Sequence, residues 1–85
     1  MNAYEKLFAD RILKICKERG ITPNRLATMS GIRQSTINNI LCGASKNPRI
    51  KTLHKIALAF GMTPSEFLDF QALNDYAFDE EEISE

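Results

Sequence analysis

Four polar side chains lie close together near the middle of the chain: Gln34, Ser35, Asn38 and Asn39. Residues four apart face the same way on an α-helix, so these two neighbouring pairs share one helix face. Asparagine and glutamine can donate and accept hydrogen bonds at once, as pairing with an adenine edge in the DNA major groove requires, and serine can adopt several such arrangements. The sequence therefore indicates a helix able to contact bases. The alternative is an ordinary solvated helix face.

Apolar residues at three- and four-residue steps predict the elements that position this helix. Helices are expected over about residues 4–19, 23–30, 34–41 and 50–60 and from residue 64 onward, with a polar loop at 44–49. The prediction is a compact all-α domain of five helices at residues 1–70. A tail at 71–85 follows, expected to pack loosely as far as residue 78 and to be mobile at 79–85.

Helix-end signals support these boundaries. The Thr22 hydroxyl can cap the second helix, and Gly31 suits the left-handed turn at its end. Thr63 and Glu66 have the spacing of a capping box at the start of the fifth helix. Within the second helix, Leu26, Ala27 and Met29 are expected to face inward.

The net charge of zero conceals a strong asymmetry along the sequence. Residues 1–64 carry all eleven Lys and Arg against three Asp and Glu, a net charge of +8. Residues 65–85 carry eight Asp and Glu and no basic residue. A basic body of this kind attracts polyanions such as nucleic acid.

Several classes of protein are excluded by what the sequence lacks. No apolar run approaches the roughly 18 residues of a membrane span, and the N-terminus has no secretion signal, so a cytoplasmic protein is expected. Cys16 and Cys42 lack metal-ligand spacing and are expected to be reduced and buried. His54 is the single histidine and has no partner for a metal or catalytic role. We therefore expect no cofactor, no metal and no enzymatic activity.

Small and apolar residues at set separations span most of the chain: Leu26-Ala27, Gly31, Ile32, Ser35-Thr36-Ile37, Ile40, Gly43, Pro48, Leu53, Ile56-Ala57 and Phe60-Gly61. This series resembles the Cro and phage-repressor-like helix-turn-helix family, also called the XRE family, over about residues 10–70. Two steeply crossing helices need a small residue where they touch and a glycine where the chain turns. The resemblance implies a lambda-repressor-like fold with the third helix in the major groove.

The resemblance also implies which residues contact DNA. Base contacts are expected from Gln34, Ser35, Asn38 and Asn39 on the third helix. Contacts with the sugar-phosphate backbone, which set register without carrying sequence information, are expected from Thr22, Asn24, Lys46, Asn47, Arg49 and Lys51. For Lys46 and Arg49 the alternative is a plain solubilising charge.

Three departures from the family pattern carry information. Arg33 stands at the N-cap of the third helix, where it cannot accept amide hydrogen bonds, at a cost of about 1 kcal/mol. We expect it to contact a phosphate or a guanine, the alternative being a surface arginine. Pro23 replaces a bracing glutamine, a role that Asn24 is expected to share. Cys16 and Leu41 replace a buried ion pair, an exchange that is often neutral or stabilising, so Cys16 is expected in the core.

The resemblance favours a small transcriptional regulator, a repressor in the first instance, that binds a palindrome as a homodimer. An antitoxin and a protein-interaction module are the alternatives. Apolar residues that could cover the chain's own core, a second copy or another protein are Leu58, Phe70, Leu73, Tyr76 and Phe78. The acidic tail is either a solubilising end or a segment that competes with DNA for the basic face of its own domain.

Overall fold

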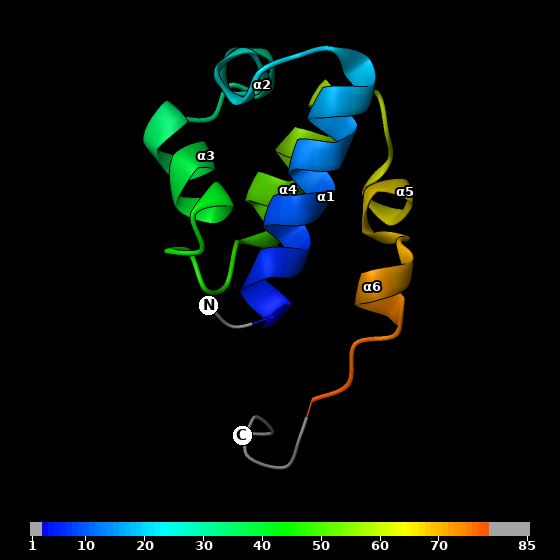
Figure 1. Cartoon of the computed structure of the whole chain (residues 1–85). Coiled ribbons are helices and arrows are strands. Elements are labelled where there is room, and N and C mark those ends of the chain that lie inside the picture. Colours follow the sequence, from blue (N-terminus) through cyan, green and yellow to red (C-terminus); the bar gives the residue numbers. More distant parts are fainter. Residues whose placement is uncertain (1–2, 79–85) are drawn as a thin grey trace.

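Six helices follow one another in residues 3–78, the part of the chain that the computed structural model describes (Figure 1). They are α1 (Ala3–Arg19), α2 (Pro23–Ser30), α3 (Gln34–Leu41), α4 (Ile50–Ala59), α5 (Pro64–Leu68) and α6 (Gln71–Asn74). α1 packs against α2, α3 and α6, while α4 packs against α2 and α5. α3 lies at one side of the α1–α4 pair, and α5 and α6 lie at the other (Figure 1). The predicted all-α class is confirmed for residues 3–78.

The turn between α2 and α3 has the predicted chemistry. Thr22 is the N-cap of α2 and its hydroxyl accepts a hydrogen bond of 3.1 Å from the Arg25 amide. Gly31 ends the helix with φ of 71°, in the left-handed region where glycine carries no steric penalty. The next amide, of Ile32, donates to the Ala27 carbonyl at 3.1 Å. These bonds satisfy groups at both ends of α2 and set the direction in which α3 starts.

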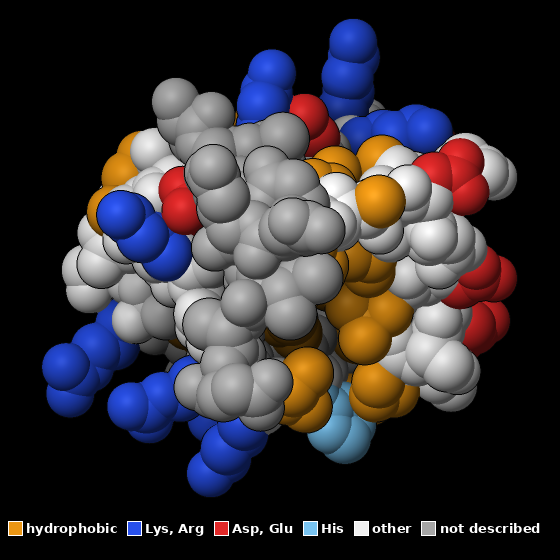
Figure 2. Space-filling model, turned by 90° about the horizontal axis from the view of Figure 1, so that it is seen from below, with side chains coloured by type: hydrophobic (Ala, Val, Ile, Leu, Met, Phe, Trp, Pro, Cys, Tyr) orange, Lys and Arg blue, Asp and Glu red, His pale blue; other side chains and the backbone are white. Residues whose placement is uncertain are grey.

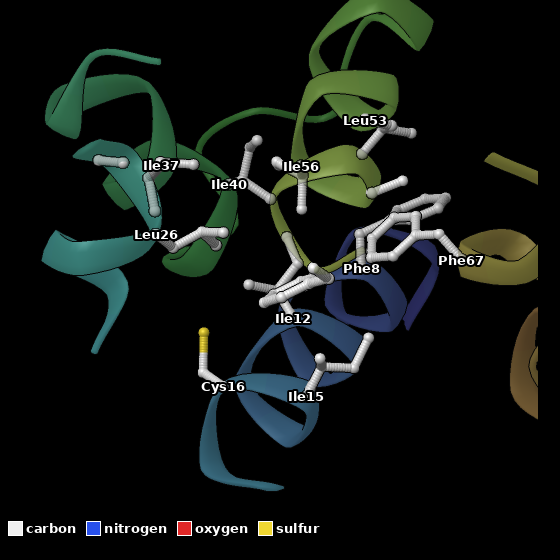
Figure 3. Packing of buried hydrophobic residues seen from close by; sticks show 13 residues of the cluster. Phe8, Ile12, Ile15, Cys16, Leu26, Ile37, Ile40, Leu53, Ile56 and Phe67 are labelled. Atoms are coloured by element: carbon white, nitrogen blue, oxygen red, sulfur yellow. The ribbon is translucent and has the colours of Figure 1, made fainter. Parts of the chain in front are cut away.

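The hydrophobic core draws side chains from α1 to α5. Its largest fully buried members are Phe60, Phe67, Ile12, Leu26, Ile37, Ile40 and Ile56. Figure 3 shows Leu26 of α2 and Ile37 and Ile40 of α3 turned into the same space as Ile12 and Ile56. Burying each Leu or Ile side chain contributes roughly 1.5–3 kcal/mol. The inner face of α3 is therefore fixed by core packing, which leaves its other face outside.

Two arginines of α1 bind the C-terminal ends of later helices. Arg11 donates from Nε to the Phe67 carbonyl at 3.0 Å and from Nη2 to the Glu66 carbonyl at 3.1 Å. Arg19 donates to the carbonyl of Phe60, and its guanidinium carbon lies 6.0 Å from that ring. Carbonyls at helix ends have no partner within the helix, and a cation also complements the negative end of the helix dipole. The arginines thus join α1 to α4 and α5, which the sequence pattern did not reveal.

The capping box at the start of α5 is present as predicted. The Glu66 amide donates to the Thr63 hydroxyl at 3.1 Å, and the Thr63 amide donates to Glu66 Oε1 at 2.8 Å. Hydrogen bonds from the backbone and side chain of Thr63 lower the pKa of the exposed Glu66 carboxyl. Both effects of Thr63 stabilise the charged form of the Glu66 carboxyl.

The sequence did not predict α6, which occupies the start of the segment assigned to the tail. Amides of Leu73 and Asn74 donate to the Phe70 carbonyl at 3.1 and 3.0 Å. The Asn74 side chain donates to Asp69 Oδ1 at 2.9 Å, and Leu73 packs against the core. A four-residue helix is too short to show a hydrophobic period, so only packing reveals it. The segment expected to be mobile, residues 79–85, lies outside the described residues.

Three side chains are less buried than predicted. Met29, expected to face inward, is 44% exposed, because Leu26 and Ala27 fill the inward positions of α2. Cys42, expected in the core, is exposed at the C-cap of α3, and Leu41 is half-buried. Cys16 is buried as predicted, and burial raises the pKa of its thiol. No helix within residues 3–78 has the length and apolar character that crossing a membrane needs.

We predict that Leu26→Ala lowers the free energy of unfolding by about 2–5 kcal/mol, because it leaves a cavity at the meeting point of α2 and α3. The matched control is Met29→Ala on the same helix, expected within about 0.5 kcal/mol of the unmodified chain since its side chain is exposed. Urea unfolding followed by circular dichroism measures both. Equal losses in the two variants would contradict the assignment of inward and outward faces.

Candidate nucleic-acid interface

The outer face of α3 carries the residues predicted to contact bases. Gln34, Ser35, Asn38 and Asn39 are all exposed, whereas Ile37 and Ile40 of the same helix are buried. α3 lies at the edge of the molecule, where α2, α5 and α6 do not cover its full length (Figure 1). The four polar side chains thus form one accessible surface.

Asn24 and Gln34 are brought together across the α2–α3 turn. The side-chain amide of Gln34 donates a hydrogen bond to Asn24 Oδ1. This contact joins the first turns of the two helices. Asn24 thus braces α3, the role expected of the glutamine that Pro23 replaces. The carbonyl oxygen of the Gln34 side chain can still accept a hydrogen bond, while Asn24 keeps its amide donors. The pair therefore presents both kinds of group beside the N-terminus of α3.

Arg33 is the N-cap of α3 and makes no capping hydrogen bond through its side chain. Its backbone is extended, with φ of −61° and ψ of 140°, and the residue is exposed. The first amides of a helix have no partner within the helix and carry a partial positive charge. Arg33 adds a full positive charge to this end of α3. The sequence-based prediction that α3 lacks a cap is correct.

The loop after α3 lies beside the same helix. The Ser45 amide donates to the Asn39 carbonyl at 3.0 Å, which folds the loop back onto the C-terminal half of α3. Between the loop, α3 and the first turn of α4 runs a groove, named here the polar groove, lined by Thr36, Ile40, Ser45, Asn47, Pro48, Arg49 and Thr52. Arg49 caps α4 without a side-chain hydrogen bond, so the amides of that first turn lack a side-chain cap as well.

The predicted backbone-contacting residues fall into two places. Lys46, Asn47, Arg49 and Lys51 are exposed in or just after the loop. Thr22 and Asn24 lie at the start of α2 instead, and the Thr22 hydroxyl is already engaged as a helix cap. Thr22 therefore offers mainly its backbone to a ligand. Placement at the two ends of α3 is what a helix lying in a groove between two phosphate strands requires.

The polar groove also contains three hydroxyl side chains that sequence reasoning missed. They belong to Thr36, Ser45 and Thr52, and each is half-buried in the groove lining. Hydroxyls can donate to phosphate oxygens as well as amides can. Thr36 and Thr52 stand on different helices, so only the tertiary structure brings them into one groove. No periodic signal in the sequence predicts that meeting.

Charge is distributed unevenly over the molecule. In the view from below, Lys and Arg side chains project on the left, the side of α3, and at the top, and most visible Asp and Glu gather on the right (Figure 2). Orange side chains form an apolar strip between these regions (Figure 2). The asymmetry read from the sequence is therefore also an asymmetry in space, with positive charge available near the polar groove.

Within the described residues, no group of three or more His, Cys, Asp and Glu is placed to hold a metal ion. His54 lies beside a small apolar groove with Ile50, Leu53 and Pro64. Among the described residues, every buried polar atom of a side chain has a hydrogen-bond partner, so none is left free to bind a ligand inside the fold.

Known proteins of two kinds are similar to this chain. The crystal structure of the prophage Lp1 protein 11 has 30% sequence identity and a TM-score of 0.78, and the match covers 89% of this chain and 100% of that one. An HTH_3 family transcriptional regulator from Vibrio cholerae has 28% identity and a TM-score of 0.69, covering 85% of this chain but 38% of the regulator. No curated protein matches the chain significantly.

A family model for the Cro/C1-type helix-turn-helix DNA-binding domain matches residues 11–72, most of the chain. This span includes α2, the Gly31 turn, α3 and the loop that follows, which are the elements described above. Because that family binds DNA, membership agrees with the expectation that the chain is not an enzyme. The chain belongs to the Cro/C1-type helix-turn-helix DNA-binding family.

Proposed function

We propose that the chain is a transcriptional regulator, acting as a repressor in the cytoplasm, that recognises a specific site in double-stranded DNA through α3. The observation that carries the proposal is the exposed amide-rich face of α3, held outward by the buried Ile37 and Ile40. Gln34 and Asn38 lie one helical turn apart on that face and can each pair with an adenine. The similar Vibrio cholerae protein is a transcriptional regulator, which supports the same class.

In the proposed complex, α3 lies in the major groove with its N-terminus toward the base edges. Base contacts come from Arg33, Gln34, Ser35, Asn38 and Asn39, all exposed. Backbone contacts come from two places. Thr22 and Asn24 contribute from the start of α2, and the other contacts come from the loop after α3 and the first turn of α4, from Lys46, Asn47, Arg49 and Lys51. Phosphates on either side of the groove then fix the register in which the amide side chains meet the bases.

We further propose that two copies bind one palindromic site, because a single α3 covers only a few base pairs. Half-sites one helical turn apart, roughly 34–36 Å, would place both copies on one side of the duplex. Of the apolar residues considered for a partner, Leu73, Tyr76 and Phe78 contact their own domain. Leu58 is 62% exposed on α4. Leu58 is therefore the proposed centre of the contact between copies.

An interaction module or an antitoxin is the second candidate function. The exposed Leu58 supports it equally, because the same apolar residue could meet a different protein. The two candidates differ in their response to salt. DNA binding through several phosphate contacts weakens steeply as salt rises, whereas an apolar protein interface responds little.

We predict that Gln34→Ala combined with Asn38→Ala abolishes selection of a palindromic site from random duplexes and leaves weak, salt-sensitive binding in place. Each lost amide pairing should cost about 1–3 kcal/mol of discrimination. Sequencing the bound fraction beside fluorescence-anisotropy titrations measures both effects.

The matched control for that experiment is Lys46→Ala, which should weaken binding to all sequences alike and make the salt dependence shallower. Unchanged site selection by the double variant would show that α3 does not read the bases. Absence of binding to any duplex at low salt, even by the unmodified chain, would favour the interaction module.

We predict that Arg33→Ser stabilises the domain and weakens its binding to DNA. Serine can cap α3, which should raise the free energy of unfolding by about 1 kcal/mol. Loss of a contact with guanine or phosphate should lower affinity about fivefold or more at fixed salt. Urea unfolding and anisotropy titration on the selected site test the two halves. A variant that is more stable and binds equally well would make Arg33 an ordinary surface residue.

We predict that two copies of the chain assemble on one selected palindromic duplex and that Leu58→Ser leaves a single copy bound at the same concentration. Sedimentation velocity with labelled duplex gives the stoichiometry directly. Leu13→Ser is the matched control, since Leu13 is another exposed leucine, 44% accessible and on α1. One unmodified chain per palindrome at saturation would contradict the homodimer.

A further inference from the structure

We propose that the acidic C-terminal segment of the chain, residues 79–85, competes with DNA for the polar groove of its own domain. Five of these seven residues are Asp or Glu. The inference rests on the proposed function and adds a means of regulation to it. DNA must displace the segment before its phosphates can reach the loop, so the affinity for DNA is set partly by the chain's own C-terminus.

The first step of the inference is the fixed point from which the segment leaves the domain. The Tyr76 and Phe78 rings lie 5.1 and 5.2 Å from the Tyr4 ring, and 4.9 Å from each other, measured between centroids. Tyr4 in turn lies 5.4 Å from the buried Phe8 at an interplanar angle of 81°. Offset and edge-on pairs at these separations are favourable. Residues 76–78 are thereby held at the start of α1.

The second step is the short path from that point to the DNA-contacting loop. Tyr4 lines an apolar groove together with Asn47, Pro48 and Ile50. Asn47 and Pro48 also line the polar groove, where Arg49 lies. The two grooves therefore share two lining residues and adjoin at the loop. Seven extended residues span roughly 23–25 Å, which is ample for a segment that starts on Tyr4.

The third step is complementarity of charge. Lys46, Arg49 and Lys51 are exposed beside the polar groove, and the uncapped first turn of α4 adds its amides. Carboxylates and phosphates are bound by the same cations and the same helix-end amides. Residues 65–78 contribute three further acids and no base, so nothing basic within that stretch neutralises the segment locally. Arg49 in the lining of the polar groove, with Lys46 and Lys51 close to it in the sequence, supplies the cations that the segment would meet there.

The proposed competition has a distinct dependence on salt. In the unmodified chain, the segment already neutralises part of the basic loop. When DNA displaces the segment, its carboxylates take up counterions, so the net release of ions on binding is smaller. Neutralising the segment should therefore raise affinity most at low salt and make the salt dependence steeper. At high salt, the contact of the loop with the segment and its contact with DNA are both screened. The unmodified chain and the chain with a neutralised segment should then bind DNA with equal affinity.

The experiment compares the unmodified chain with Glu80→Gln/Glu81→Gln/Glu82→Gln and with a matched triple variant, Glu5→Gln/Asp10→Asn/Glu18→Gln. Both variants remove three negative charges, the second from α1 rather than from the segment. Binding to a generic duplex is titrated at several salt concentrations. We expect the segment variant to bind about threefold or more tightly at low salt than the α1 variant, with a steeper slope against salt. Equal affinity of the two variants would reduce the effect to net charge and overturn the inference.

A second measurement tests the contact without DNA. Amide chemical shifts of residues 45–51 are compared between the unmodified chain and the segment variant, with the α1 variant as reference. Shifts confined to the segment variant support the inference, and unchanged shifts overturn it while leaving the proposed function intact. If none of the three proteins binds duplex at low salt, the proposed function fails and the competition fails with it, whatever the shifts show.

Discussion

The whole arrangement depends on the burial of one face of α3 against α1 and α2, in a core that α4 shares. Ile37 and Ile40 are at most 2% exposed, and Leu26 of α2 and Ile56 of α4 are fully buried in the same core. Ala27 is 6% exposed, and it is among the inward residues of α2 in the core cluster. Since a helix of eight residues is only marginally stable alone, this packing both forms α3 and determines which of its side chains face outward.

α1 is the element that extends this arrangement to the other side of the molecule. Arg11 and Arg19 donate to carbonyls at the ends of α5 and α4, and Arg11 also lies 5.1 Å from the Phe70 ring. At the start of the same helix, the Tyr4 ring packs against the rings of Tyr76 and Phe78, which follow α6. The α3 side and the α5–α6 side of the molecule are thus coupled through one helix. That coupling brings the chain's last described residues near the loop that follows α3.

At the N-termini of α3 and α4, residues suited to binding DNA occupy positions where other residues would stabilise the helix more. Arg33 and Arg49 occupy N-cap positions where serine, threonine, asparagine or aspartate would stabilise the helix more. By contrast, α2 and α5, which carry none of the proposed base contacts, have threonine caps with the expected hydrogen bonds. The missing side-chain caps leave a cation and free amides at the start of α3, beside Arg33, and at the start of α4, where Arg49 lines the polar groove. The cations and the free amides both favour the binding of a polyanion.

How far the sequence alone predicts this protein can be judged from particular residues. The period of apolar residues, the caps at Thr22 and Thr63 and the turn at Gly31 predict α1 to α5 correctly, because these signals are local. Met29 was wrongly expected inside and Cys42 wrongly expected buried, since the inward stripe of a short helix is narrower than its apolar composition suggests. The four-residue α6 leaves no local signal at all.

Three features can be read from the residues in order along the chain: the family, the outward polar set on α3 and the segregation of acidic from basic residues. Each follows from residue types at spacings that a helix converts directly into faces. Tertiary structure decided the hydrogen bond between Gln34 and Asn24, the meeting of Thr36, Ser45 and Thr52 in the polar groove, and the arginine contacts of α1. Those depend on how helices cross and where loops return, which are set by side-chain volumes packed across the core rather than by neighbours along the chain.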